Sequence, residues 1–130
     1  MSNAARIRWG RIVAGGLLAE LAILIVALPF AFVASGERIL FYLVPPACLV
    51  MTFVFGRWTG NRVESRYVLH GTLAGVVAAL VYIAVTWNQT LPSSYVLAHW
   101  LKVIGGAAGG YAASRSRRIT SDKLAGANIS

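Results

Sequence analysis

Two ionisable side chains interrupt otherwise apolar stretches of the sequence, and they carry its clearest chemical signal. Glu20 lies in the apolar run of residues 12–34, and Lys102 lies in the apolar run of residues 95–114. Both runs are long enough to cross a bilayer, where a charge near the centre costs roughly 2.5–3.5 kcal/mol. Because charges at such depth usually mark a partner or a pathway, this polar pair is the first candidate for a functional site.

The depths of the two residues are compatible with direct contact. In a bundle of four antiparallel spans, the first run starts and the fourth run ends on the same side of the membrane. At about 1.5 Å per residue, Glu20 lies roughly 12 Å and Lys102 roughly 18 Å from that side. If the two helices are adjacent, the side chains can span the difference of about 6 Å. Three interpretations remain open: an internal ion pair that fixes helix register, a water-filled path that titrates or binds substrate, and contact of each charge with a partner subunit.

Two histidines are accessory polar candidates. His99 precedes Lys102 by three residues, and Gly106 follows Lys102 by four, so all three share one helical face. His70 lies near the beginning of the third apolar run, and we expect it to be solvated there.

Four apolar runs predict the elements that must position these side chains. The composition is 58% hydrophobic and only 12% charged, whereas soluble domains carry about 25% charged residues. A chain of 130 residues cannot bury this much apolar surface in a water-soluble core. Because the connections are short, neighbouring helices should be antiparallel. We therefore expect an all-α, integral membrane four-helix bundle over residues 12–114, with spans at residues 12–34, 39–55, 68–87 and 95–114.

The basic residues predict the orientation of this bundle. Except for Arg38 and Lys102, all lie in the N-terminal segment 1–11, the middle loop 56–67 or the tail 115–130. Basic residues are enriched in cytoplasmic segments, so both termini should be cytoplasmic. The basic polar tail is expected to fray or to lie on the membrane surface. The bases are Arg6, Arg8, Arg11, Arg57, Arg62, Arg66, Arg115, Arg117, Arg118 and Lys123.

Small residues and prolines predict how the helices pack. Gly105 and Gly109, and likewise Gly106 and Gly110, form two interleaved GxxxG pairs, and Gly71 and Gly75 form a third. Such rows let two backbones approach closely, within the bundle or in a homo-oligomer. Pro45 and Pro46 interrupt the second run, where a kink or a short unwound segment is expected.

No catalytic or metal-binding motif stands out in the sequence. It lacks HExxH, GxSxG and Walker patterns, and its one cysteine, Cys48, is expected to be a small core residue. We predict no enzyme activity and no cofactor. The formal charge of +8 is better explained by anionic lipid headgroups on the cytoplasmic face than by nucleic acid.

Two resemblances to membrane protein families follow from these motifs. The segment GGLLAE, residues 15–20, resembles the first helix of small multidrug resistance transporters, which implies Glu20 as a proton site. The sequence departs from that family at Lys102, which would repel cations, and in residues 75–85. The wider layout resembles uncharacterised small four-helix bacterial membrane proteins in the motifs GRW (56–58), HG (70–71) and LKVIGG (101–106).

Together these features predict a protein of the bacterial cytoplasmic membrane. Its expected role is structural or accessory, within a homo-oligomer or together with a membrane protein partner. The alternative is a small proton-coupled transporter or channel that uses Glu20 and Lys102.

Overall fold

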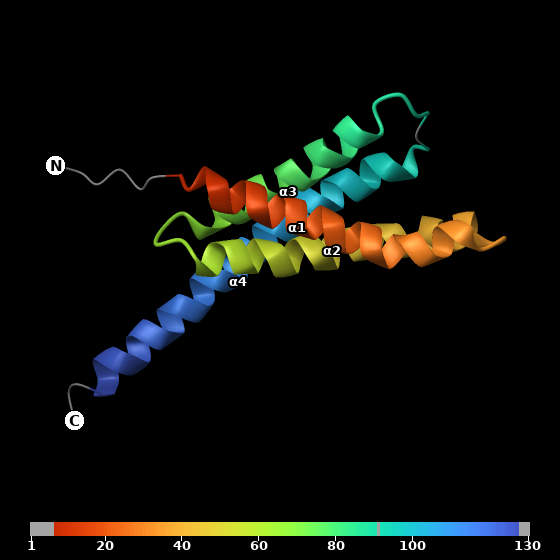
Figure 1. Ribbon diagram of the computed structural model, residues 1–130. Coiled ribbons are helices and arrows are strands. Elements are labelled where there is room, and N and C mark those ends of the chain that lie inside the picture. The colour runs from red at the N-terminus through yellow and green to blue at the C-terminus, as the bar shows by residue number, and fades with distance from the viewer. Residues whose placement is uncertain (1–6, 91, 128–130) are drawn as a thin grey trace.

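The computed structural model describes residues 7–90 and 92–127, and within them the chain is all-α. The helices run alternately up and down in one bundle (Figure 1). Among the predicted residues, Arg6 lies outside the described ranges. The elements are α1 (Trp9–Ala27), which is continued by the 3-10 helix η1 (Leu28–Phe32), α2 (Gly36–Asn61), α3 (Tyr67–Val85) and α4 (Ser94–Ala127).

Among the described residues, three helical segments are long and apolar enough to cross a membrane: Trp9–Phe32, Gly36–Asn61 and Tyr67–Val85. The first of them needs η1 to reach this length, and Pro29 is accommodated in the first turn of η1. The helix α4 is not among these segments. Its buried face consists largely of glycine and alanine, which pack closely but contribute little apolar surface.

Two helices, α2 and α4, extend well beyond the ends of their apolar runs. The second run ends at Phe55, but α2 continues to Asn61. Glu37 lies in the first turn of α2, where its negative charge interacts favourably with the helix dipole. The fourth helix runs past Ser114 to Ala127, so the expectation of a frayed tail is wrong for residues 115–127. Polarity ended the apolar runs, but these residues include no proline that would end the helices.

The prolines of α2 do not unwind it. Pro45 and Pro46 both lie inside a continuous α-helix, so the expected unwound segment is not present in α2. Each proline removes one N–H donor, and the affected acceptors are the carbonyls four residues earlier, on Phe41 and Tyr42. The hydrogen bonds on either side are sufficient to maintain the helix across this single turn.

The bundle has two ends that differ in construction. We call the end where α2 finishes and α3 begins the closed end, and the end where α1 finishes and α4 begins the open end (Figure 1). The helices α2 and α3 pack against each other and against both α1 and α4. No Cα atom of α1 lies within 8 Å of a Cα atom of α4, so these two helices occupy opposite corners of the bundle.

The two glycine rows of α4 pack against different helices. A Cβ atom at Gly105 would meet Thr52 and Leu49 of α2, whereas one at Gly106 would meet the Gly71 carbonyl oxygen of α3. The next glycine of each row repeats this pattern: Gly109 faces Phe53 of α2, and Gly110 faces Tyr67 of α3. Gly75 lies against the backbone of α4 at Lys102 and Val103. The glycines thus wedge α4 between α2 and α3, and their packing is internal to one chain.

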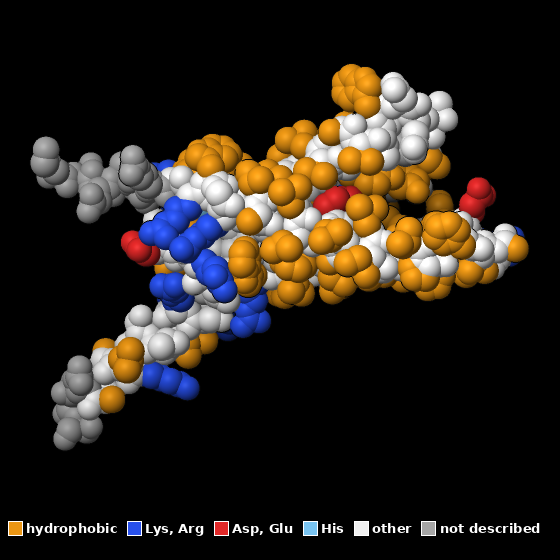
Figure 2. All heavy atoms as spheres, viewed as in Figure 1, with side chains coloured by type: hydrophobic (Ala, Val, Ile, Leu, Met, Phe, Trp, Pro, Cys, Tyr) orange, Lys and Arg blue, Asp and Glu red, His pale blue; other side chains and the backbone are white. Residues whose placement is uncertain are grey.

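The surface divides into an apolar flank and a basic end. Figure 2 shows hydrophobic side chains along the flank of the bundle and Lys and Arg gathered at the closed end, near the root of the extended part of α4. Large apolar side chains such as Leu21, Ile25, Trp100 and Ile104 are more than half exposed. Exposed apolar surface on this scale is typical of a protein that faces lipid.

Candidate functional site

Glu20 and Lys102 form a direct ion pair inside the bundle. The Lys102 Nζ atom donates a hydrogen bond of 2.7 Å to Glu20 Oε2, and the two side chains are only 4% and 2% exposed, respectively. This geometry matches the interpretation of the two charges as an internal ion pair. Each charge neutralises the other inside the bundle, and removal of one partner would leave a buried, uncompensated charge.

The pair connects two helices whose Cα atoms do not come within 8 Å of each other. The sequence made this contact possible if α1 and α4 were adjacent, but their backbones lie at opposite corners of the bundle. The long lysine side chain bridges the distance through the core. On α1, Gly16 packs closely on Ala74 and Val77 of α3, which brings the α1 backbone toward the bundle axis. The ion pair therefore links α1 and α4, the two helices at opposite corners, through the interior of the bundle.

Aromatic rings surround the lysine end of the pair. The Tyr82 ring of α3 lies 4.7 Å from Lys102 Nζ, within the range of a cation–π interaction. Tyr82 also stacks on Tyr95 at 5.7 Å and contacts the His99 ring at 5.3 Å between centroids. Tyr82 could not be identified from the sequence, since no spacing on α3 links it to α4. Tyr95 was detectable, because it precedes His99 by four residues on the same helical face.

A small cavity adjoins the ion pair on its open-end side. It has a volume of about 130 Å³ and is lined by residues of all four helices, including Glu20, Cys48, Tyr82, His99 and Lys102. Two buried polar atoms, Glu20 Oε1 and His99 Nδ1, have no hydrogen-bond partner among the described residues. Most residues that line the cavity are apolar, but its volume has room for water molecules that would satisfy these two atoms.

A larger groove continues from this cavity to the open end. It has a volume of about 520 Å³ and lies between the first half of α2 and the start of α4. The groove and the cavity share four lining residues, Leu40, Val44, Tyr95 and Ala98. Glu37 and Arg38 line the groove near the start of α2, and Pro45 lines its wall. The polar centre therefore approaches the surface from the open end.

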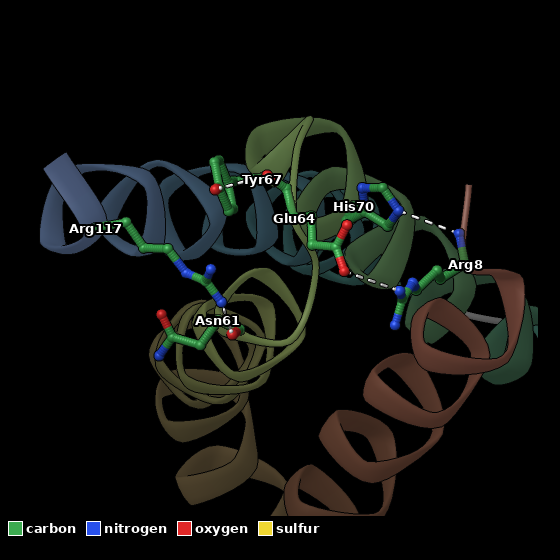
Figure 3. Close-up of polar contacts among 6 residues, drawn as sticks. All are labelled: Arg8, Asn61, Glu64, Tyr67, His70 and Arg117. Carbon is green, nitrogen blue, oxygen red and sulfur yellow. Dashed lines mark hydrogen bonds and ion pairs between the residues drawn. The ribbon is translucent and has the colours of Figure 1, made fainter. Parts of the chain in front are cut away.

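His70 belongs to the closed end and is not solvated, contrary to expectation. It is 1% exposed, its Nε2 atom accepts a hydrogen bond of 3.2 Å from the Arg8 backbone N–H, and its Nδ1 atom lies 2.9 Å from the Arg66 carbonyl oxygen. These contacts fit the tautomer with the proton on Nδ1. His70 thus ties the start of α1 to the start of α3 (Figure 3).

Further polar contacts hold the α2–α3 connection in place. Arg8 forms an exposed ion pair of 3.3 Å with Glu64, and Arg117 donates a hydrogen bond of 2.7 Å to the Asn61 carbonyl oxygen (Figure 3). Tyr67 donates to the Glu64 carbonyl oxygen. These contacts are structural, and together with His70 they fix the closed end.

Comparison with known protein families, curated proteins and solved structures found no match to this chain. Within residues 7–90 and 92–127, no group of three or more His, Cys, Asp or Glu side chains is arranged to hold a metal ion. Cys48 is a buried free thiol in a small core cluster with Ile23 and Ala98. The site is therefore defined by its own geometry: a buried ion pair, neighbouring aromatic rings and a small adjoining cavity.

Proposed function

We propose that this chain is an integral protein of the bacterial cytoplasmic membrane that crosses the bilayer four times, with both termini in the cytoplasm. Three candidate spans support the membrane location. The first part of α4 is proposed as the fourth span because Val96, Trp100 and Ile104 are exposed on its outer face while its glycines face inward. The proposed orientation follows from the bases at the closed end.

Within that setting, we infer a structural or accessory role in a homo-oligomer or a larger membrane complex. The observation that carries this inference is the 2.7 Å contact between Lys102 and Glu20. Both intramembrane charges are used within the chain, so neither is left free to move a substrate. The glycine rows are also occupied internally, so a partner protein would contact the exposed apolar flank.

The test of this role compares single and double neutralisation of the pair. Glu20→Gln or Lys102→Met alone should lower the free energy of unfolding by about 3–5 kcal/mol, because each leaves one buried charge uncompensated. The double variant should recover most of this loss. The exposed pair Arg8–Glu64 is the matched control, and its neutralisation should cost less than about 1 kcal/mol. Additive losses in the double variant would contradict a structural pair.

The cavity favours a second candidate, a small proton-coupled transporter or channel. Glu20 Oε1 and His99 Nδ1 are unpartnered, among the described residues, beside a cavity that adjoins the open-end groove. In proteoliposomes with an imposed pH gradient, such a protein would carry a flux that Glu20→Gln abolishes and Glu64→Gln leaves unchanged. That result would overturn the accessory role, whereas the absence of flux from the wild-type protein would remove the transporter candidate.

A further inference from the structure

A second hollow lies on the closed-end surface, away from the ion pair. It has a volume of about 590 Å³ and lies between the start of α3 and the second half of α4. Three arginines line it: Arg66 at the end of the α2–α3 connection, and Arg115 and Arg118 on α4. We call this hollow the basic groove, and its lining also includes Tyr67, Val68 and Tyr111.

Several bases of the closed end are already engaged with other groups, whereas, within the described residues, the three arginines of the basic groove are not. Arg8 pairs with Glu64, Arg117 bonds the Asn61 carbonyl oxygen, and Arg62 lies over the Trp58 ring. For the side chains of Arg66, Arg115 and Arg118, the described part of the chain provides neither a hydrogen-bond acceptor nor an acidic partner. Three positive charges therefore converge on one hollow, and no residue of the ranges 7–90 and 92–127 supplies a counter-charge there.

Local structure explains why the three side chains converge. Arg66 has a left-handed backbone conformation, with φ of 54°, where the chain turns from the connection into α3. Arg115 and Arg118 are three residues apart and therefore share one face of α4. Close packing of Gly110 on Tyr67 and Val68 holds the start of α3 against this part of α4. The groove is thus built on the same glycine contacts that close the bundle.

The chemistry of the groove matches a phosphate group. Guanidinium groups bind phosphate oxygens with paired, charge-assisted hydrogen bonds, and three of them can surround one tetrahedral anion. The start of α3 adds to this preference, since no side chain caps its first N–H groups and the helix dipole is positive there. The arginines define the site, and the helix start contributes only a further attraction.

The surroundings of the groove match a lipid rather than a free anion. Val68 and Tyr111 are 42% and 59% exposed beside the arginines, and they continue into the apolar flank of α3 and α4. In the proposed orientation this position lies at the cytoplasmic headgroup level. A ligand there can place its phosphate among the arginines and its acyl chains along apolar side chains, as basic pockets at the cytoplasmic ends of membrane helices do.

We propose that the basic groove is a binding site for an anionic phospholipid, with Arg66, Arg115 and Arg118 holding its phosphate. The site deepens the proposed membrane role by assigning a specific lipid contact to the cytoplasmic face, and it rests on that role. Phosphatidylglycerol is a suitable probe of this class, because it has one phosphate and a net negative charge.

Native mass spectrometry of the full-length protein in detergent micelles tests the proposal. Phosphatidylglycerol should be retained about tenfold more strongly than phosphatidylcholine, which has the same phosphate but no net charge. The triple variant Arg66→Gln/Arg115→Gln/Arg118→Gln should lose this preference. The control variant Arg57→Gln/Arg62→Gln/Lys123→Gln removes the same charge from positions outside the groove and should keep most of it.

Three outcomes would overturn the lipid site. Equal loss of lipid retention in both triple variants would mean that the charges attract the lipid diffusely. Equal retention of the two lipids would mean that the groove does not select an anionic lipid. Competition by millimolar inorganic phosphate would mean that the groove binds the free anion. The variants should unfold at the wild-type temperature without added lipid, which separates lost binding from lost folding. Because micelles require neither membrane orientation nor a partner, failure of the lipid site leaves the proposed role to its own test.

Discussion

The closed end and the open end are built from the same four helices but are held together in different ways. At the closed end, Gly106 and Gly71 bring the α3 and α4 backbones into contact, and a Cβ atom at Gly56 would lie 2.7 Å from the Gly106 carbonyl oxygen. At the open end, Tyr82 and Tyr95 stand between helices, and cavities remain. Figure 1 shows the helices diverging toward that end.

The difference between the two ends shows that side-chain size sets the separation of the helices, which apolar burial alone cannot set. In lipid, helices associate through close packing and polar contacts, because the surrounding chains are as apolar as leucine. The α4 sequence changes from large residues at Tyr95 and His99 to glycine and alanine, except for Tyr111, between residues 105 and 113. Lys102 lies at this change, where its carbonyl oxygen packs against Gly75. The ion pair therefore braces the bundle where backbone contact ends.

The largest expected effect comes from separating the helices at the closed end. Gly106→Leu places a bulky side chain against the Gly71 carbonyl oxygen and the Gly75 backbone, which cannot move without displacing α3. We expect a loss of more than about 3 kcal/mol in the free energy of unfolding, measured by denaturant titration in micelles. Gly10→Leu is the control, since a Cβ at Gly10 meets nothing within 4 Å. Equal stability of the two variants would contradict the wedge arrangement.

A matched pair of alanines on α4 should show an intermediate effect. Ala113 is fully buried, and a Cβ at Gly60 would already lie 2.7 Å from its Cβ atom, so Ala113→Val should cost about 1–3 kcal/mol. Ala98 is also buried but lines both open-end hollows, so Ala98→Val should be neutral or stabilising by up to about 1 kcal/mol. Thermal unfolding of both variants checks the contrast. A similar cost at both positions would mean that the open end is packed as tightly as the closed end.

The smallest expected effect concerns the ring over Lys102. Tyr82→Leu should lose the cation–π attraction, which is worth about 0.5–2 kcal/mol, whereas Tyr82→Phe keeps a ring and should lose less. A double-mutant cycle of Tyr82→Leu with Lys102→Met isolates this contribution from lost packing. A coupling energy of zero would show that the ring only fills space.

Much of this arrangement could be predicted from the sequence, and the remainder depends on tertiary contacts. Helical spacing was enough to group His99 with Lys102 and to identify the glycine rows. The extension of α4 to Ala127 was missed because polarity ends an apolar run without ending a helix. Tyr82 was missed because its partners lie on α4. His70 was misjudged as solvated because the Arg8 N–H that bonds to it lies far away in the sequence.

The position of the paired charges along the chain has a consequence for biogenesis. Glu20 and Lys102 are 82 residues apart, on the first helix and the last. In the proposed membrane setting, a nascent chain with three helices carries an uncompensated glutamate in the bilayer until α4 enters. The helix α4 is the least apolar of the four, and its lysine adds an insertion cost of roughly 2.5–3.5 kcal/mol. Pairing of Lys102 with Glu20, which is already in the bilayer, offsets that cost, so the first helix assists the integration of the last.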